Sequence, residues 1–348
     1  MLVTFLFLVC VFSCSVSAAQ NPTPAVDTSS VPTGMVGTWW QTTGSDDYAA
    51  LRIGADGTFT RVASDIADGD YWWDHGTMSA ASGSFSGNIE ESSDASNVGE
   101  TISGTYSISG DGTEITLTMG SDTEIYEKAA PYANAPASGA TGDWLMTHRI
   151  IGGSPQPTSE IQKMIVDSHG LVSLYAYPET TSPAIFGVMS VNDSTDTITI
   201  AAVWSSESAS VFSGDYNLSG DQLTMLATRY SRLTGSVDTD AVGTWVQTSI
   251  SGPTSVNPAV VEDYISFKIS SNSRDRMYNV SGDFSSTEWE RASLNSTADG
   301  HCLRVIDAAG DPNKVGTAQK LHVQISGETM TVEEWQERDR YEYTFQKA

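Results

Sequence analysis

Few residues in this sequence have types that suggest chemistry, and His148 stands first among them. It follows Trp144 and Met146 at steps of two residues. Successive side chains of a strand face opposite sides, so an inward Trp144 predicts that Met146 and His148 also point inward. An enclosed imidazole is a common general base or ligand anchor; the alternative is a structural histidine bonded to a core neighbour. We assign His148 as the candidate catalytic residue and Met146 as a candidate ligand contact.

A second candidate group lies in the segment Asp70-Tyr-Trp72-Trp73-Asp-His75. Two indoles and an imidazole so close in sequence predict the mouth of a ligand pocket, although such rings also fill ordinary cores. We therefore list Trp72, Trp73 and His75 as candidate ligand-binding residues.

The other candidates for metal or nucleophilic chemistry are weaker. His169 is expected at an exposed hairpin tip. His301 and Cys302 are adjacent, so in a strand they face opposite sides, which argues against a shared metal. The acidic segment 65–70 lacks the ligand spacing of an EF-hand loop. The sequence contains no Gly-x-Ser-x-Gly, His-Glu-x-x-His, P-loop or paired-cysteine motif, and we expect no metal and no cofactor.

Internal repetition shows which elements must position these residues. The segment Val-Gly-Thr-Trp39 recurs as Val-Gly-Thr-Trp245, with Thr-Gly-Asp-Trp144 between them, so the tryptophans lie 105 and 101 residues apart. A second repeat places Ser-Gly followed by an acidic residue at Gly110, Gly220 and Gly327. Two blocks with nearly constant spacing predict three modules, spanning residues 33–130, 138–234 and 238–348.

Each module has the pattern of a β-protein. Apolar and polar residues alternate, and the runs end in Asp-Gly, Ser-Gly or Asn-Ser turns, which predict hairpins. About eight short strands in about 100 residues favour a small closed antiparallel barrel, because closure removes exposed edges. We therefore expect an all-β fold of three consecutive barrels. The two-residue alternation used for His148 predicts that four further residues point into the barrels: Gln41, Thr43, Gln247 and Ser249.

On these residues the sequence resembles the lipocalin-like (calycin) barrels. The resemblance rests on a first strand with Gly-x-Trp, a meander of hairpins, and a last strand that carries an aromatic and a basic residue. In that family the tryptophan closes one barrel end and the basic residue lies over its ring. The resemblance implies three such pairs: Trp39 with Lys128, Trp144 with Arg232, and Trp245 with Lys347. The third module departs from the spacing, because Phe345 stands where the basic residue is expected.

Composition and the N-terminus limit the compartment and the partners. The chain has 43 Asp and Glu against 17 Lys and Arg, a net charge of -26, which argues against nucleic acid and anionic membranes as partners. Residues 1–18 have the apolar run and small residues of a secretory signal peptide, with a lipoprotein anchor at Cys14 as the alternative. We expect a secreted, extracellular protein whose mature chain keeps only Cys302 and therefore has no internal disulfide. Four triplets could carry N-glycans in a eukaryotic source, at Asn192, Asn217, Asn279 and Asn295.

Two function classes remain open. One is a secreted protein that binds a small hydrophobic molecule in a barrel. The other is a secreted, cofactor-independent enzyme acting on a small hydrophobic substrate, an isomerase or a luciferase-type oxidase, because the lipocalin-like barrels include light-emitting oxidases of several modules. The interiors are expected to differ, with His148 in one module against Thr43 and Ser249 in the others, which keeps the enzyme hypothesis open. A ligand cavity of about 300–1,000 Å³ would locate the site.

Overall fold

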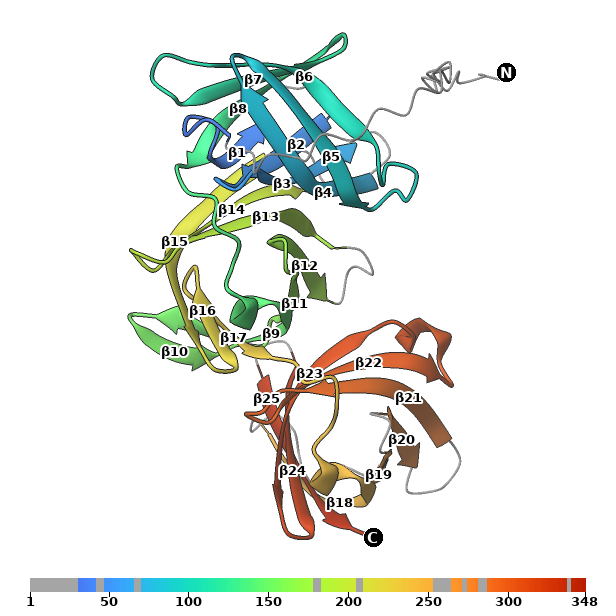
Figure 1. Ribbon diagram of the computed structural model, residues 1–348. Coiled ribbons are helices and arrows are strands. Elements are labelled where there is room, and N and C mark those ends of the chain that lie inside the picture. The colour runs from blue at the N-terminus through green and yellow to red at the C-terminus, as the bar shows by residue number, and fades with distance from the viewer. Residues whose placement is uncertain are drawn as a thin grey trace, which may run out of the picture.

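The computed structural model describes residues 31–41, 47–65, 70–177, 183–204, 209–252, 264–270, 274–280, 287–336 and 339–348. Nearly all regular structure in these ranges is antiparallel β-sheet. The strands form three modules that follow one another in a row, with the N-terminal module at one end and the C-terminal module at the other (Figure 1). The predicted fold class, all-β with three antiparallel barrel modules, is confirmed.

The first barrel consists of eight strands, each paired with its neighbours in sequence, and it closes through pairing of β1 with β8. Its strands are β1 (Gly37–Gln41), β2 (Asp47–Ile53), β3 (Thr58–Asp65), β4 (Asp70–Ala81), β5 (Ser84–Ser92), β6 (Thr101–Ile108), β7 (Glu114–Met119) and β8 (Asp122–Ala130).

The middle module is a nine-stranded sheet that curls back on itself, because β9 pairs with β17 as well as with β10 and β11. Its elements are η1 (Ser138–Ala140), β9 (Gly142–Ile151), β10 (Ser154–Pro157), β11 (Ile161–Val166), β12 (Leu171–Tyr177), β13 (Ile185–Asn192), β14 (Thr197–Trp204), β15 (Ala209–Ser219), β16 (Gln222–Met225) and β17 (Thr228–Arg232).

The third barrel again closes eight strands, here through pairing of β18 with β25. Its elements are η2 (Thr239–Ala241), β18 (Gly243–Ser251), β19 (Tyr264–Ile269), β20 (Arg274–Val280), β21 (Thr287–Ser296), β22 (His301–Ala309), η4 (Pro312–Lys314), β23 (Ala318–Ser326), β24 (Thr329–Gln336) and β25 (Asp339–Lys347). Closed eight-stranded meanders of this kind are the architecture of lipocalin-like proteins.

A buried tryptophan closes each module in the same way. Trp39, Trp144 and Trp245 have no exposed surface, and each indole N–H donates to the carbonyl oxygen four residues earlier, at 2.8–2.9 Å. The three predicted cation–π pairs are confirmed. The cations of Lys128, Arg232 and Lys347 lie 4.4, 4.2 and 5.3 Å from the centres of the respective rings.

In the middle and third modules, the glycine two residues before the tryptophan makes room for this cation, and in the first module Gly37 makes room for the carbonyl oxygen of Ala130. Gly142 has φ +127°, and a Cβ atom there would lie 2.7 Å from Nη1 of Arg232. Gly243 has φ +150°, and its Cβ would lie 2.9 Å from the side chain of Lys347. The repeated Gly-x-Trp is therefore a packing requirement of the tryptophan and cation pair.

The predicted hairpins also form, with glycines of positive φ in their turns. Gly57 (φ +84°) lies between β2 and β3, and Gly170 (φ +75°) between β11 and β12. The second repeated block forms β15–β16 around Gly220 and β23–β24 around Gly327.

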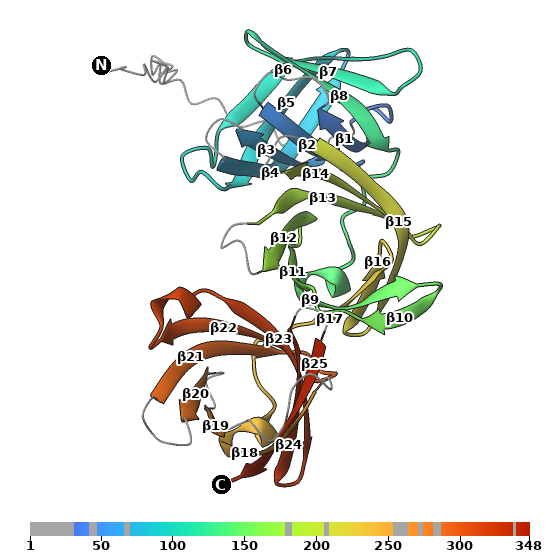
Figure 2. The same ribbon diagram turned by 180° about the vertical axis from the view of Figure 1, so that it is seen from behind.

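The view from behind shows the same row of three modules (Figure 2). Apolar contacts join each module to the next. Strands β13 and β14 pack against β2 and β3, and bury Phe186 and Val203 against Ala50 and Val62. The contact between the middle module and the third barrel is smaller; its buried apolar residues are Leu145, Leu233, Leu303 and Ala318. Polar side chains at both junctions surround these contacts.

Candidate functional site

The first barrel carries a polar network inside its apolar core. Arg61 on β3 pairs with Glu124 on β8, and the guanidinium lies 4.5 Å from the ring centre of Trp72. The buried Tyr126 donates its hydroxyl to Glu124 at 2.8 Å. Burial raises the pKa of Tyr126, so this hydroxyl keeps its proton as a donor. Arg61 and Glu124 retain about a fifth of their side-chain surface exposed (21% and 18%), so the network is within reach of solvent.

A cavity of about 50 Å³ adjoins this network. Besides the polar side chains, its lining is apolar and includes Leu51, Ile53, Phe59, Met78, Phe85, Ile89, Ile102, Leu117 and Met119. Two buried atoms in the cavity wall, Arg61 Nε and Asp74 Oδ1, have no hydrogen-bond partner. Buried polar groups are usually paired, so these two atoms mark a place for a polar group of a bound molecule.

The aromatic segment of β4 does not form one pocket mouth. Trp72 packs with the first barrel's core, whereas Trp73 packs with the cluster between the first barrel and the middle module. His75 lies on the same outer side as Trp73 and stacks on His169 of the middle module. The prediction of a shared site is wrong because side chains of a strand alternate between its two faces.

His148 lies outside the middle module, contrary to the sequence prediction. Trp144 and Met146 belong to the interior core, as expected. In the pairing of β9 with β17, however, Met146 lies opposite Tyr230 and His148 lies opposite Arg229. Thr147 therefore has no partner of its own in β17. This β-bulge shifts the alternation by one residue and turns His148 outward, 5.7 Å from the ring of His301 in the third barrel.

The same bulge recurs in the third barrel. Gln247 pairs with Phe345 and Ser249 with Thr344, and the Thr248 hydroxyl donates to the Thr344 carbonyl at 3.1 Å. Ser249 is consequently exposed, and its predicted inward position is wrong for the same reason. Gln41 and Gln247 are buried, while Thr43 lies outside the described residues.

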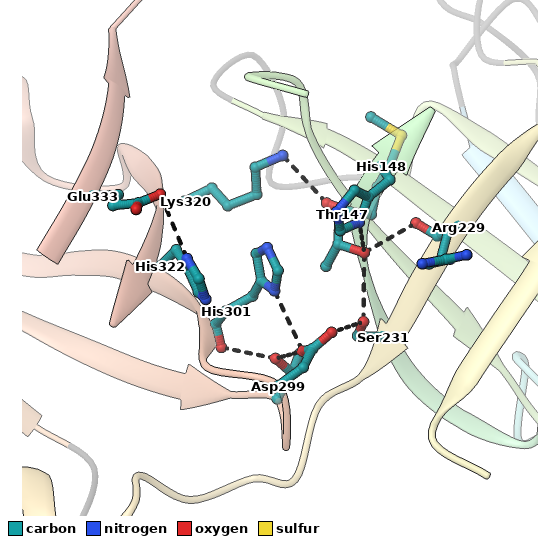
Figure 3. Close-up of polar contacts among 11 residues, drawn as sticks. Thr147, His148, Arg229, Ser231, Asp299, His301, Lys320, His322 and Glu333 are labelled. Carbon is teal, nitrogen blue, oxygen red and sulfur yellow. Dashed lines mark hydrogen bonds and ion pairs between the residues drawn. The ribbon is translucent and has the colours of Figure 1, made fainter. Parts of the chain in front are cut away.

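His148 belongs to a polar cluster between the middle module and the third barrel (Figure 3). The rings of His301 and His322 stack at 4.7 Å. His301 Nδ1 lies 3.3 Å from Asp299, which also accepts from Ser231 of the middle module at 2.8 Å. A cavity of about 200 Å³ is lined by all three imidazoles.

Lys320 connects the two modules at this cluster. Its ammonium group, on the third barrel, donates to main-chain carbonyls of the middle module: Glu160 at 2.7 Å, Met146 at 3.3 Å, and Thr158. The side chain is buried, and burial lowers its pKa to about 8.

The other junction carries a second pair of imidazoles. His75 and His169 stack with ring centres 3.6 Å apart, next to the buried guanidinium of Arg52. Arg52 donates to Thr60 at 3.1 Å and to the carbonyls of Ala133 and His169. A cleft of about 440 Å³ opens beside these groups. His169 is at the predicted hairpin tip, but it is docked on the first barrel and is not freely exposed as expected.

Three pKa shifts follow from these surroundings. Burial lowers the pKa of His75, and His169 and Arg52 lower it further. Burial, His301 and Arg229 in the same way lower the pKa of His148. For Asp299, burial acts to raise the pKa, but hydrogen bonds from His301, Thr297 and Ser231 outweigh it and hold the pKa well below its usual range.

The remaining predicted residues are placed as follows. Cys302 is buried in the core of the third barrel while His301 faces outward, as their adjacency predicts. Within the described ranges, no three histidine, cysteine, aspartate or glutamate side chains are placed to hold a metal ion. No helix in the same ranges is long and apolar enough to cross a membrane. The signal segment 1–18 and positions 66–69 of the acidic segment lie outside the described residues.

Sequence reasoning missed the polar groups of the first barrel and Lys320. The sequence pattern could have identified Arg61, because it lies two residues from Phe59 and from Ala63 and therefore on the same inward face of β3. No comparable signal identifies Lys320, whose partners are main-chain carbonyls about 160 to 174 residues away in sequence.

Comparisons with known proteins do not identify a family for this chain. No protein-family model and no curated protein sequence matches this chain. One similar solved structure is transferrin binding protein B from Neisseria meningitidis, at 9% identity and a TM-score of 0.20 over 84% of this chain; the match covers 66% of that protein, just under two thirds of its length. Another is a protein of unknown function from the DUF3598 family of Nostoc punctiforme, at 8% identity and a TM-score of 0.18, covering 90% of this chain and 97% of the other. At such identities and scores, neither likeness bears on function.

Proposed function

We propose that this chain is an exported binding protein that holds a small apolar molecule with a hydroxyl group inside the first barrel. The observation that carries the proposal is the pair of unpartnered atoms, Arg61 Nε and Asp74 Oδ1, in the wall of an otherwise apolar cavity. Arg61 and Asp74 stand directly opposite each other on β3 and β4, so one ligand group can reach both.

The chemistry of these two atoms selects the ligand group. A buried polar atom without a partner costs about 1–3 kcal/mol, so a ligand that pairs both atoms gains affinity. A hydroxyl group accepts from the guanidinium N–H and donates to the carboxylate at the same time. An ionised carboxylate only accepts and an ammonium group only donates, so neither satisfies both atoms.

The cavity also limits the size of the ligand. A volume of about 50 Å³ holds about three or four water-sized groups, far below the usual ligand pocket. A larger molecule requires its lining to move, and the flexible side chains of Met78 and Met119 are the part of the lining that adapts most easily.

The interiors of the middle module and the third barrel are less suited to such a ligand. The core of the middle module is built from apolar side chains such as Met146, Met164 and Met189. In the third barrel, Arg304 is fully buried but bonded to Gln319 at 2.6 Å and to Glu290 at 3.0 Å. The first barrel is therefore the favoured seat of a ligand.

Calorimetric titration with phenol and benzene tests the proposal, because the two probes differ only in the hydroxyl group. We expect phenol to bind at least tenfold more tightly to the full chain. Asp74→Leu keeps the branched shape of the side chain but removes the acceptor, so it should abolish the preference while benzene binding remains. Asp215→Leu, at an exposed position on β15, is the matched control. Equal affinities for the two probes, or an unchanged preference in Asp74→Leu, overturn the proposal.

The 440 Å³ cleft beside His75 is a second candidate, favoured by its volume, which falls in the usual range of ligand pockets. Its walls carry Arg52, Ser168 and Asn134, and so suit a polar molecule rather than an apolar one. A ligand there should lose affinity in His75→Gln and keep it in Asp74→Leu, which separates the two sites.

Export and catalysis need separate tests. The signal-like segment 1–18 supports export, and N-terminal sequencing of protein from the medium should begin at Ala19 or Gln20. The hypothesis of an isomerase or luciferase-type oxidase depended on His148 being enclosed with an apolar substrate. Because His148 instead faces His301, we favour binding over catalysis.

A further inference from the structure

All five histidines of the chain lie at the two junctions between modules. His75 of the first barrel meets His169 of the middle module, and His148 of the middle module meets His301 of the third barrel. The fifth, His322, stacks on His301. Imidazole is the side chain whose ordinary pKa lies closest to neutrality, so the junctions hold every group of this type in the protein.

The second junction, between the middle module and the third barrel, places two cations beside His148. Lys320 and Arg229 lower the pKa of His148, and Asp299 of the third barrel raises it. Glu160 faces Lys320 but pairs with Arg149, and among the described residues neither Lys320 nor Arg229 has a carboxylate within ion-pair distance. The one carboxylate that bonds His301, Asp299, belongs to the same barrel as His301. Glu333 bonds His322 and is shared with Arg340, again within the third barrel.

We propose that the junction between the middle module and the third barrel is an acid-sensitive latch, which opens below about pH 6 while the junction between the first barrel and the middle module stays closed.

Charge repulsion across the second junction is the physical cause. Protonation of His148 places an imidazolium group edge-on to the ring of His301, 5.7 Å away across the junction (Figure 3). Lys320 and Arg229 stand beside it and oppose the new charge, and Asp299 offsets them only in part. Asp299 stays bonded to His301 whether the modules are docked or apart, so that ion pair does not hold the junction together. The apolar contact beneath the cluster is also the smaller of the two.

The first junction differs in two respects. Glu91 of the first barrel lies 3.3 Å from Nε2 of His169, so a carboxylate of one module faces an imidazole of the other across this junction and favours docking in acid. Glu90 also faces His75 and partly offsets Arg52. The larger apolar cluster around Phe186 and Val62 is independent of pH.

The sign of the pH dependence follows from the docked histidine. The pKa of His148 is lowered in the docked state, so the separated modules bind more protons. The contribution of this histidine to docking is therefore fully present above the ordinary pKa of about 6.5 and is lost as the pH falls below it. Each unit of difference between the docked and separated pKa values weakens docking up to tenfold.

Small-angle scattering of the full chain between pH 7.5 and 5.5 tests this latch. We expect the radius of gyration to rise in acid, with the near-ultraviolet circular dichroism of the barrels unchanged. The net charge of -26 shrinks in magnitude over the same range, which alone would draw the modules together, so an expansion cannot come from overall charge.

Three variants test which histidines cause the expansion in acid. His148→Gln and His301→Gln each remove one member of the pair that crosses the junction, and either one should suppress the expansion. His75→Gln, the same substitution at the other junction, should expand like the wild type. A constant radius in the wild type, or an undiminished expansion in both His148→Gln and His301→Gln, overturns the inference. The titration with phenol is independent of it, because the first barrel is not part of this junction.

Discussion

Replacing Lys320 by methionine should release the third barrel from the middle module. The buried ammonium group makes three hydrogen bonds to carbonyls of the middle module, and bonds from a charged donor contribute about 1.5–3 kcal/mol each. Burying the charge of Lys320 opposes these hydrogen bonds. Burial lowers the pKa of Lys320 from 10.5 to about 8, which corresponds to a cost of about 3.4 kcal/mol. The difference is a net loss of docking free energy of about 1–6 kcal/mol, and we expect about 3 kcal/mol, or roughly a 150-fold change.

Cleavage of the connector 233–242 by a dilute protease measures this change, because under these conditions the rate follows the population of the open form. The rate should rise about 150-fold in Lys320→Met. Lys268→Met is the matched control, because Lys268 lies on β19 of the same barrel and is exposed. It should change the rate less than about fivefold, as exposed substitutions do. A wild-type rate in Lys320→Met would refute the role of Lys320.

Three further predictions follow from the same structure. Between pH 7.5 and 9 the docked Lys320 loses its proton while a free lysine keeps it, so docking should strengthen and connector cleavage should slow about eightfold in the wild type but not in Lys320→Met. Trp144→Ala should lower the free energy of unfolding in urea by about 3–5 kcal/mol, because the ring is fully buried. Gly142→Ala should cost more than about 1 kcal/mol and alter the indole fluorescence by displacing Arg232, whereas Gly110→Ala, whose Cβ meets nothing within 4 Å, should be nearly neutral.

Cysteine chemistry supplies an independent check on stability. If segment 1–18 is removed, Cys302 is the only cysteine left, and it is buried. Dithiothreitol should then leave the urea midpoint of the secreted protein unchanged, and a shift in the midpoint would contradict the expected absence of a disulfide.

Features that depend on local spacing could be predicted from the amino-acid sequence. The repeats predicted three modules, the turn residues predicted the hairpins, and the resemblance identified each cation that lies over a tryptophan ring. These features were predictable because a strand alternates with period two and a tight turn demands glycine within a few residues.

The direction in which the candidate site residues face depends on contacts between strands that are distant in sequence. One extra residue at Thr147 moved His148 from the interior to a junction, and such a bulge is visible only in the pairing of β9 with β17. The alternation of side chains along β4 places Trp72 and His75 on opposite faces of the strand. The residues that each of them contacts come from other strands, and for His75 from another module. Lys320 finds its acceptors on the main chain of another module. Every residue has a main-chain carbonyl group, so no pattern of side chains could have predicted which carbonyl groups Lys320 would bind.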